Sequence, residues 1–121
     1  MPANKTILVV EDNEINRLML SELLSLEYTV LEAENGQQAL DVLEKRKDEI
    51  SLILLDITMP VMDGYTFLSI AKADPVLASI PVIVTTQSDS EADEVAALSH
   101  GATDYVAKPY KPQIIRHRVA S

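Results

Sequence analysis

Residues 51–60, SLILLDITMP, decide the fold of this chain. Four apolar residues, 52–55, run without interruption into the carboxylate of Asp56. An apolar run of this length is typical of a strand that is covered on both faces, as in the centre of a parallel sheet. We therefore expect Asp56 at the point where this strand leaves the core.

A second apolar run ends in the same way. Residues 7–10, ILVV, lead directly into Glu11 and Asp12. If the two strands are neighbours, their ends lie about 4.8 Å apart, and three carboxylates meet at one edge of the sheet. At about 4 Å and an effective dielectric constant of about 20, each like-charge contact costs on the order of 4 kcal/mol. Such a cluster requires a cation to stabilise it.

Composition excludes several classes of function. The 121 residues suit one domain, and 10 basic against 19 acidic residues give a net charge of -9, which argues against a surface for nucleic acid or anionic membrane. The chain has no tryptophan and one phenylalanine, too few aromatic residues for a platform that stacks bases. Cysteine is absent, so disulfides and thiolate metal sites are excluded. Residues 1–13 resemble neither a signal peptide nor a membrane span, so a cytoplasmic location is expected.

Strand-like and helical segments alternate along the chain. Strands are predicted over residues 6–10, 28–33, 52–55, 81–85 and 104–107, and helices over residues 14–26, 38–46, 65–73, 88–100 and from 112 onward. The inward face of the first helix is predicted to carry Ile15, Leu18, Met19, Leu23 and Leu26, which recur at helical spacing.

This alternation predicts a single doubly wound α/β domain with a five-stranded parallel sheet and five helices. Periodicity does not determine strand order, so the order 2-1-3-4-5 is taken from the flavodoxin-like fold. Such sheets bind ligands outside the carboxyl ends of their strands, at the point where the strand order reverses. The residues expected at these ends are Glu11, Asp12, Asp56, Thr86 and Lys108.

The residue types at this edge suit phosphoryl transfer. Oxygen ligands from several carboxylates are typical of Mg²⁺, which keeps some of its waters and accepts a phosphate oxygen. Asp56 can then act as a nucleophile toward phosphorus. The Lys108 ammonium and the Thr86 hydroxyl can contact the phosphoryl oxygens, whose charge must be neutralised during transfer.

Together these residues resemble the receiver domain of two-component response regulators, the CheY-like family, over essentially the whole chain. The motif elements are Glu11-Asp12, Asp56 followed by Met59-Pro60 and Asp63-Gly64, Thr86 thirty positions after Asp56, and Lys108-Pro109. The resemblance implies that Asp56 is the phosphoacceptor and that Glu11, Asp12, Asp56 and the backbone carbonyl of Thr58 bind Mg²⁺. It also implies that Lys108 contacts the phosphoryl group and that Thr86 and Tyr105 form the switch.

One position departs from the family pattern. The residue after the switch threonine is usually small, whereas here it is Gln87. Its amide could shield the acyl phosphate or donate a hydrogen bond to it, and the sequence leaves both open. Thr58 and Ser88 flank the same approach and could also tune hydrolysis.

Other functions remain as alternatives. Asp56-Ile57-Thr58 resembles the D-x-T nucleophile loop of haloacid-dehalogenase phosphatases, but that family carries the loop near its N-terminus and adds a cap domain. A receiver used only for docking, without phosphorylation, is the third hypothesis. Each residue also has a plainer explanation, such as a helix cap at Asp12 or strand packing at Thr86.

The resemblance implies partners and a larger context. We expect a histidine kinase or phosphotransfer protein as donor, self-catalysed phosphorylation and dephosphorylation as the only chemistry, and switching of the face formed by the fourth helix, fifth strand and fifth helix. The last helix pattern reaches Ser121 without a terminating glycine or proline, so residues 1–121 are predicted to be a receiver domain of a longer protein with a C-terminal output domain. Acidic residues 89–94 and the basic residues Lys111, Arg116 and Arg118 could pair across a homodimer formed on phosphorylation.

Overall fold

The computed structural model describes residues 5–56, 64–86, 91–107 and 111–120. The strands are β1 (Thr6–Val10), β2 (Thr29–Ala33), β3 (Ile50–Asp56), β4 (Val82–Thr86) and β5 (Asp104–Ala107). The helices are α1 (Glu14–Leu24), α2 (Gly36–Arg46), α3 (Gly64–Ala73), α4 (Glu91–Ser99) and α5 (Pro112–Ala120), and short 3₁₀ turns follow α2 and α3 at Lys47–Glu49 and Leu77–Ser79. All strand pairs are parallel and the order is β2-β1-β3-β4-β5, which confirms the predicted fold.

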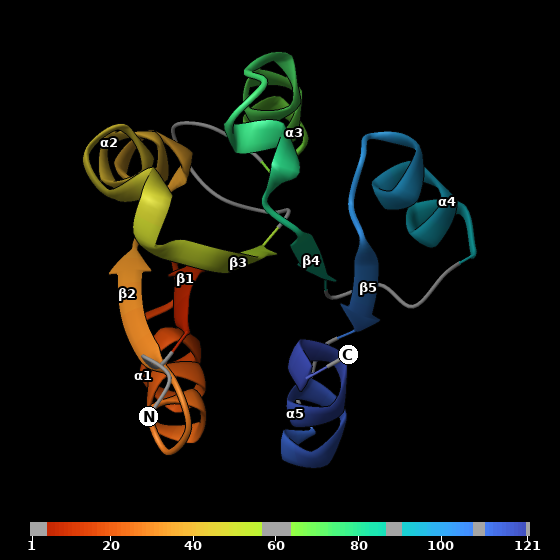
Figure 1. Ribbon diagram of the computed structural model, residues 1–121. Helices are drawn as coiled ribbons and strands as arrows, with labels where there is room; N and C mark the ends of the chain where they lie inside the picture. The colour runs from red at the N-terminus through yellow and green to blue at the C-terminus, as the bar shows by residue number, and fades with distance from the viewer. Residues whose placement is uncertain (1–4, 57–63, 87–90, 108–110, 121) are drawn as a thin grey trace.

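Helices cover both faces of the sheet. Figure 1 shows α1 and α5 on one face and α2, α3 and α4 on the other. Because side chains alternate along a strand, neighbouring residues of β1 enter different cores. Leu8 joins a cluster that includes Leu43 and Phe67, whereas Ile7 joins a cluster that includes Leu20 and Ile115. The central strands are therefore buried on both sides, as their unbroken apolar runs predict.

Local sequence signals set several of the boundaries. The Asn13 side chain caps α1 by accepting a hydrogen bond from the Asn16 amide at 2.9 Å, and Asn35 caps α2 through the Gln38 amide at the same distance. Gly101 follows α4 with φ +105°, a conformation that glycine adopts without strain. The two asparagine caps fix where α1 and α2 begin, shortly after the carboxyl ends of β1 and β2.

The predicted inward face of α1 is wrong for four of its five residues, since only Leu23 packs against the core. Ile15 is 77% exposed and Leu18 is 49% exposed, while Leu20 and Leu24 are buried against the sheet. The helix also ends at Leu24, which leaves Leu26 outside it and exposed. Apolar residues occur on more than one side of this helix, so spacing alone favoured a face that the fold leaves in solvent.

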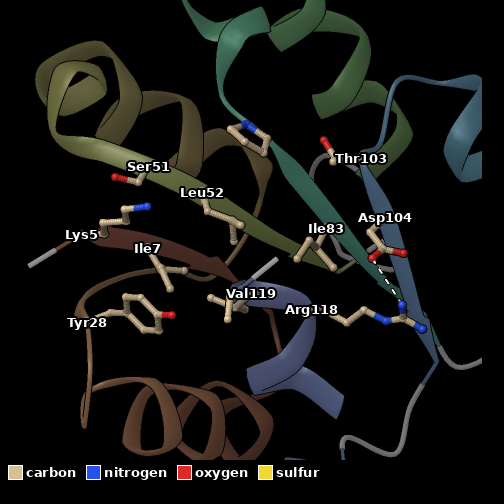
Figure 2. Close-up of a pocket in the computed structure, with 12 residues that line it drawn as sticks. Lys5, Ile7, Tyr28, Ser51, Leu52, Ile83, Thr103, Asp104, Arg118 and Val119 are labelled. Atoms are coloured by element: carbon tan, nitrogen blue, oxygen red, sulfur yellow. Dashed lines mark ion pairs between the residues drawn. The ribbon is translucent and has the colours of Figure 1, made fainter. Parts of the chain in front are cut away.

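A pocket of roughly 340 Å³ lies at the amino ends of the strands (Figure 2). Its apolar lining includes Ile7, Leu52, Ile83 and Val119, and Arg118 at its edge pairs with Asp104 at 3.7 Å. The carboxylates at the strand ends lie at the opposite edge of the sheet, so this pocket does not serve them. No helix in the described part of the chain is long and apolar enough to cross a membrane.

Candidate functional site

Strand register brings the candidate residues to one edge of the sheet. Val10 pairs with Leu55, so Glu11 and Asp56, the next residue in each case, lie at the ends of adjacent strands. Asp56 in turn pairs with Thr85, and Thr86 is the last residue of β4. Strand β1 has β2 on one side and β3 on the other, so the strand order reverses here. The carboxyl ends of the strands at such a reversal are the expected ligand-binding position in a doubly wound sheet.

The three predicted carboxylates do lie together. Glu11, Asp12 and Asp56 each offer an oxygen, and these oxygens all lie within 4.8 Å of one another. Glu11 and Asp56 are buried, at 1% and 2% exposure, whereas Asp12 is exposed. At such separations each like-charge pair costs on the order of 3 kcal/mol at an effective dielectric constant of about 20. Two buried carboxylates and one exposed carboxylate form an oxygen donor set that fits a hard divalent cation.

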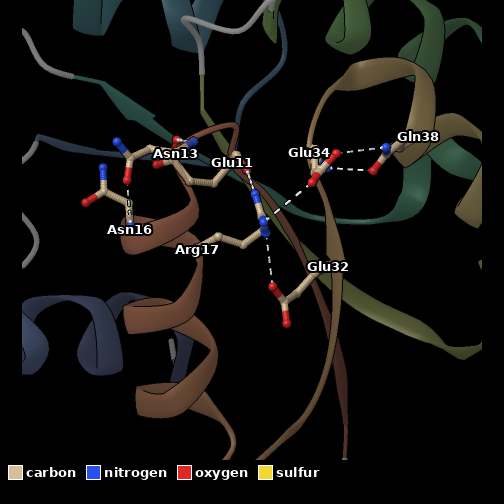
Figure 3. A network of polar contacts seen from close by, with 7 residues as sticks. All are labelled: Glu11, Asn13, Asn16, Arg17, Glu32, Glu34 and Gln38. Carbon is tan, nitrogen blue, oxygen red and sulfur yellow. Dashed lines mark hydrogen bonds and ion pairs between the residues drawn. The ribbon is translucent and has the colours of Figure 1, made fainter.

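Several hydrogen bonds fix Glu11 in place. Its amide donates to the Ala33 carbonyl at 3.0 Å, which ties it to the end of β2. Its own carbonyl accepts from Arg17 Nη1 at 3.0 Å, and its Oε2 accepts from the Asn13 amide at 3.3 Å. Figure 3 shows the contact between Glu11 and Arg17. The residue that begins the acid pair is therefore held through its backbone as well as its side chain.

The two predicted switch residues are part of the described structure. Thr86 is 7% exposed and pairs with Ala107 of β5, so it lies one strand beyond Asp56 at the same edge. Tyr105 is half-buried, pairs with Val84 and packs against the core under α2, α3 and α4. The strand register therefore places Thr86 at the edge that carries the carboxylates, and Tyr105 on the neighbouring strand.

The remaining predicted site residues lie outside the described residues. These are Thr58, Gln87, Ser88 and Lys108. Lys108 follows Ala107, which is the last residue of β5 and the partner of Thr86 in the register. Their predicted roles stay predictions.

Sequence reasoning did not single out Arg17. This residue contacts Glu32 at 3.1 Å and Glu34 at 3.6 Å, in addition to the Glu11 carbonyl. A signal was available, because Arg17 is the one basic residue of the first predicted helix, and the acidic residues Glu32 and Glu34 lie near the end of the next predicted strand and just after it. Connecting them required the pairing of β1 with β2, which periodicity does not give.

The fold and the site together define a class. A doubly wound sheet with a carboxylate cluster at its reversal point is an α/β domain that can hold a hard cation beside a buried carboxylate nucleophile.

Comparison with known proteins narrows this class to a family. The family model for the response regulator receiver domain matches residues 7–120. The response regulator PleD of Caulobacter vibrioides (strain NA1000 / CB15N) is 39% identical over 116 residues, which are 95% of this chain and 25% of that protein. The "Probable transcriptional regulator ycf27" of Porphyra purpurea is 35% identical over 116 residues, 95% of this chain and 46% of that protein.

A solved structure agrees with these matches. The receiver domain of sensor histidine kinase PA1611 from Pseudomonas aeruginosa PAO1, solved with a magnesium ion in its active site cleft, aligns with a TM-score of 0.86 at 32% identity. The alignment covers 97% of this chain and 95% of that one. This chain therefore belongs to the response regulator receiver domain family, and its acidic site fits a magnesium-binding phosphoacceptor. The chain spans less than half the length of the curated relatives PleD and ycf27.

Proposed function

We propose that Asp56 accepts a phosphoryl group from the phosphohistidine of a histidine kinase or phosphotransfer protein. The observation that carries this proposal is the burial of Asp56 within 4.8 Å of Glu11 and Asp12. In the proposal, Glu11, Asp12, Asp56 and the backbone carbonyl of Thr58 hold Mg²⁺. When bound, the ion would neutralise the acidic cluster and the charge of the incoming phosphoryl group.

The transfer balances without a further reactant. A carboxylate oxygen of Asp56 forms the new O–P bond as the N–P bond of the phosphohistidine breaks, and the imidazole nitrogen leaves with the electron pair. We assign Lys108 and the Thr86 hydroxyl to the phosphoryl oxygens, where an ammonium and a hydroxyl offset developing charge. Water then cleaves the acyl phosphate, and we assign Thr58, Gln87 and Ser88 to the control of that rate.

The adduct on Asp56 is proposed to act as a signal and not as a step in metabolic turnover. Thr86 and Tyr105 would relay it to the face formed by α4, β5 and α5. The relatives described above are longer than this chain, which supports an output domain after Ser121, and dimerisation on phosphorylation is a further part of the proposal. A cytoplasmic location is inferred from the same family role.

A phosphatase of the haloacid-dehalogenase type is the weaker alternative. The family match covers residues 7–120 of this chain. This match favours a signalling module over a phosphatase.

Intact mass spectrometry after incubation with Mg²⁺ and acetyl phosphate tests the proposal. We expect one phosphoryl adduct per chain, no adduct with Asp56→Asn, and an unchanged adduct with the control Asp48→Asn, which alters an exposed aspartate in the 3₁₀ turn after α2. Catalytic release of phosphate from many ester molecules would support the phosphatase instead. A chain that gives no adduct with any donor would be a docking module.

A further inference from the structure

We propose that Arg17 is a positioning residue for the magnesium site, through the peptide that joins Glu11 to Asp12. This inference rests on the proposed Mg²⁺ binding and adds a residue that touches neither the ion nor the phosphoryl group. The contact that carries it is the hydrogen bond from Arg17 Nη1 to the Glu11 carbonyl oxygen, at 3.0 Å.

Arg17 is a largely buried cation that joins three segments of the chain. Its side chain is 12% exposed and extends from α1 toward the ends of β1 and β2 (Figure 3). Nε donates to Glu32 at 3.1 Å, Nη2 lies 3.6 Å from Glu34, and Nη1 reaches the Glu11 carbonyl. The two carboxylates hold the guanidinium against β2, so its remaining arm has a fixed direction.

The Glu11 carbonyl that accepts the hydrogen bond from Arg17 lies between the two acidic residues in the chain. It belongs to the peptide between Glu11 and Asp12, and a peptide unit is planar, so its direction limits the rotation of both residues. On the other side of Glu11, the amide donates to the Ala33 carbonyl at 3.0 Å. The backbone that carries both acidic side chains is thus tied to β2 directly and through Arg17.

A guanidinium suits this task and an ammonium does not. Arginine presents several donors in a rigid planar fork, whereas lysine carries one compact charge on a flexible stem. A lysine at position 17 keeps the charge but cannot hold a carbonyl and two carboxylates in three fixed directions. Arg17→Lys therefore separates geometry from charge.

Two competing roles for Arg17 predict different results. If Arg17 acted only through its charge, removing it would strengthen Mg²⁺ binding, since two cations repel each other, and Arg17→Lys would bind Mg²⁺ normally. If Arg17 only stabilised the fold, Arg17→Lys and Arg17→Met would lower the free energy of unfolding in EDTA but leave the Kd of the folded chain for Mg²⁺ unchanged. The positioning role predicts weaker Mg²⁺ binding in both Arg17→Lys and Arg17→Met, because groups behind metal ligands typically change metal affinity by about 10-fold or more.

The test is a Mg²⁺ titration of the full chain, without phosphodonor, followed by amide NMR. We expect Arg17→Lys and Arg17→Met to raise the Kd for Mg²⁺ about 10-fold, and to shift the Asp12 amide resonance before any metal is added. The control Arg46→Met removes an exposed ion pair in which Arg46 Nε lies 3.0 Å from a carboxylate oxygen of Glu49. The hydrogen bond from Arg46 lowers the pKa of the Glu49 carboxyl. That control should leave the Kd unchanged.

The outcomes distinguish this inference from the proposed function. If the wild-type chain binds Mg²⁺ and the Arg17→Lys variant binds it with equal affinity, the positioning role alone is overturned. Wild-type chain that does not bind Mg²⁺ would overturn the proposed function and this inference with it. Urea unfolding of each variant in EDTA shows whether it is folded, and if Arg17→Met is not, Arg17→Lys still decides the question.

Discussion

At the scale of single residues, the acidic site trades stability for reactivity. Glu11 and Asp56 are buried beside each other and beside Asp12, although like charges at this range repel. A fold selected for stability alone would replace one of them by a neutral residue. Their presence together is what makes the edge of the sheet suitable for a divalent cation and a nucleophile.

This trade predicts that Asp56→Asn makes the metal-free chain more stable. The amide has nearly the same shape but removes one buried charge, so we expect the free energy of unfolding in EDTA to rise by about 1 to 3 kcal/mol. Mg²⁺ should stabilise the wild-type chain and have much less effect on the variant. Urea denaturation with and without Mg²⁺ measures both effects, with Asp48→Asn as the control. A variant less stable than wild type in EDTA would show that the hydrogen bonds of the Asp56 carboxylate outweigh its repulsion by Glu11 and Asp12.

The sequence was sufficient to single out the carboxylates, and the strand order of the fold was needed to bring them together; neither revealed the groups that support them. Glu11, Asp12 and Asp56 each end a recognisable apolar run, so their meeting follows from strand adjacency. Arg17 could not be found in this way, because Glu32 near the end of β2 and Glu34 just after it come close to Arg17 only through the pairing of β2 with β1. Lys108 and Gln87 stay predictions drawn from the family pattern.

At the scale of elements, α1 shows where periodicity fails. The helix carries apolar residues on two sides, and the side with Leu20 and Leu24 is buried while Ile15 and Leu18 face solvent. Met19, at 40% exposure, extends the exposed side. This apolar surface begins three residues after Asp12. A protein that delivers a phosphoryl group to Asp56 would therefore contact it.

We therefore expect Leu18→Ser to slow phosphotransfer from a phosphohistidine protein and to leave labelling by acetyl phosphate unchanged. Exposed apolar side chains beside a reaction site favour docking of a partner, whereas a small donor needs no such surface. Loss of one buried contact in the complex should slow transfer about 10-fold at limiting donor. Leu98→Ser on α4, a residue of similar exposure at 45%, is the matched control. Equal slowing in both variants would contradict a docking role specific to α1.

At the scale of the whole molecule, two cores share one sheet. The cluster under α1 and α5 and the cluster under α2, α3 and α4 both include residues of β1, β3 and β4. Alternation of elements predicted this architecture because a parallel sheet needs helices on both faces. The strand order came from the resemblance, and the extent of the protein beyond residues 1–121 stays a prediction.

The sheet also connects the site to the face formed by α4, β5 and α5. Thr86 is buried at the end of β4, and β5 lies beside β4 with Thr86 opposite Ala107 and Val84 opposite Tyr105. Helix α4 packs against β5, whereas β2 is separated from β4 by β1 and β3. A movement of Thr86 toward a phosphoryl group on Asp56 would therefore displace β5 and α4 before β2.

Hydrogen exchange read by mass spectrometry tests this direction of coupling. On phosphorylation by acetyl phosphate with Mg²⁺, we expect exchange rates to change by several-fold in peptides from α4 and β5 and to stay the same in peptides from β2 and α2, since β5 pairs with Thr86 and α4 packs against β5. Thr86→Ala should still form the adduct but lose the change in α4 and β5, while Thr29→Ala, on the exposed edge strand, should behave as wild type. If Thr86→Ala kept the full change in α4 and β5, the signal would travel by a route that does not involve this hydroxyl, and the proposed switch would be wrong even with Asp56 phosphorylated.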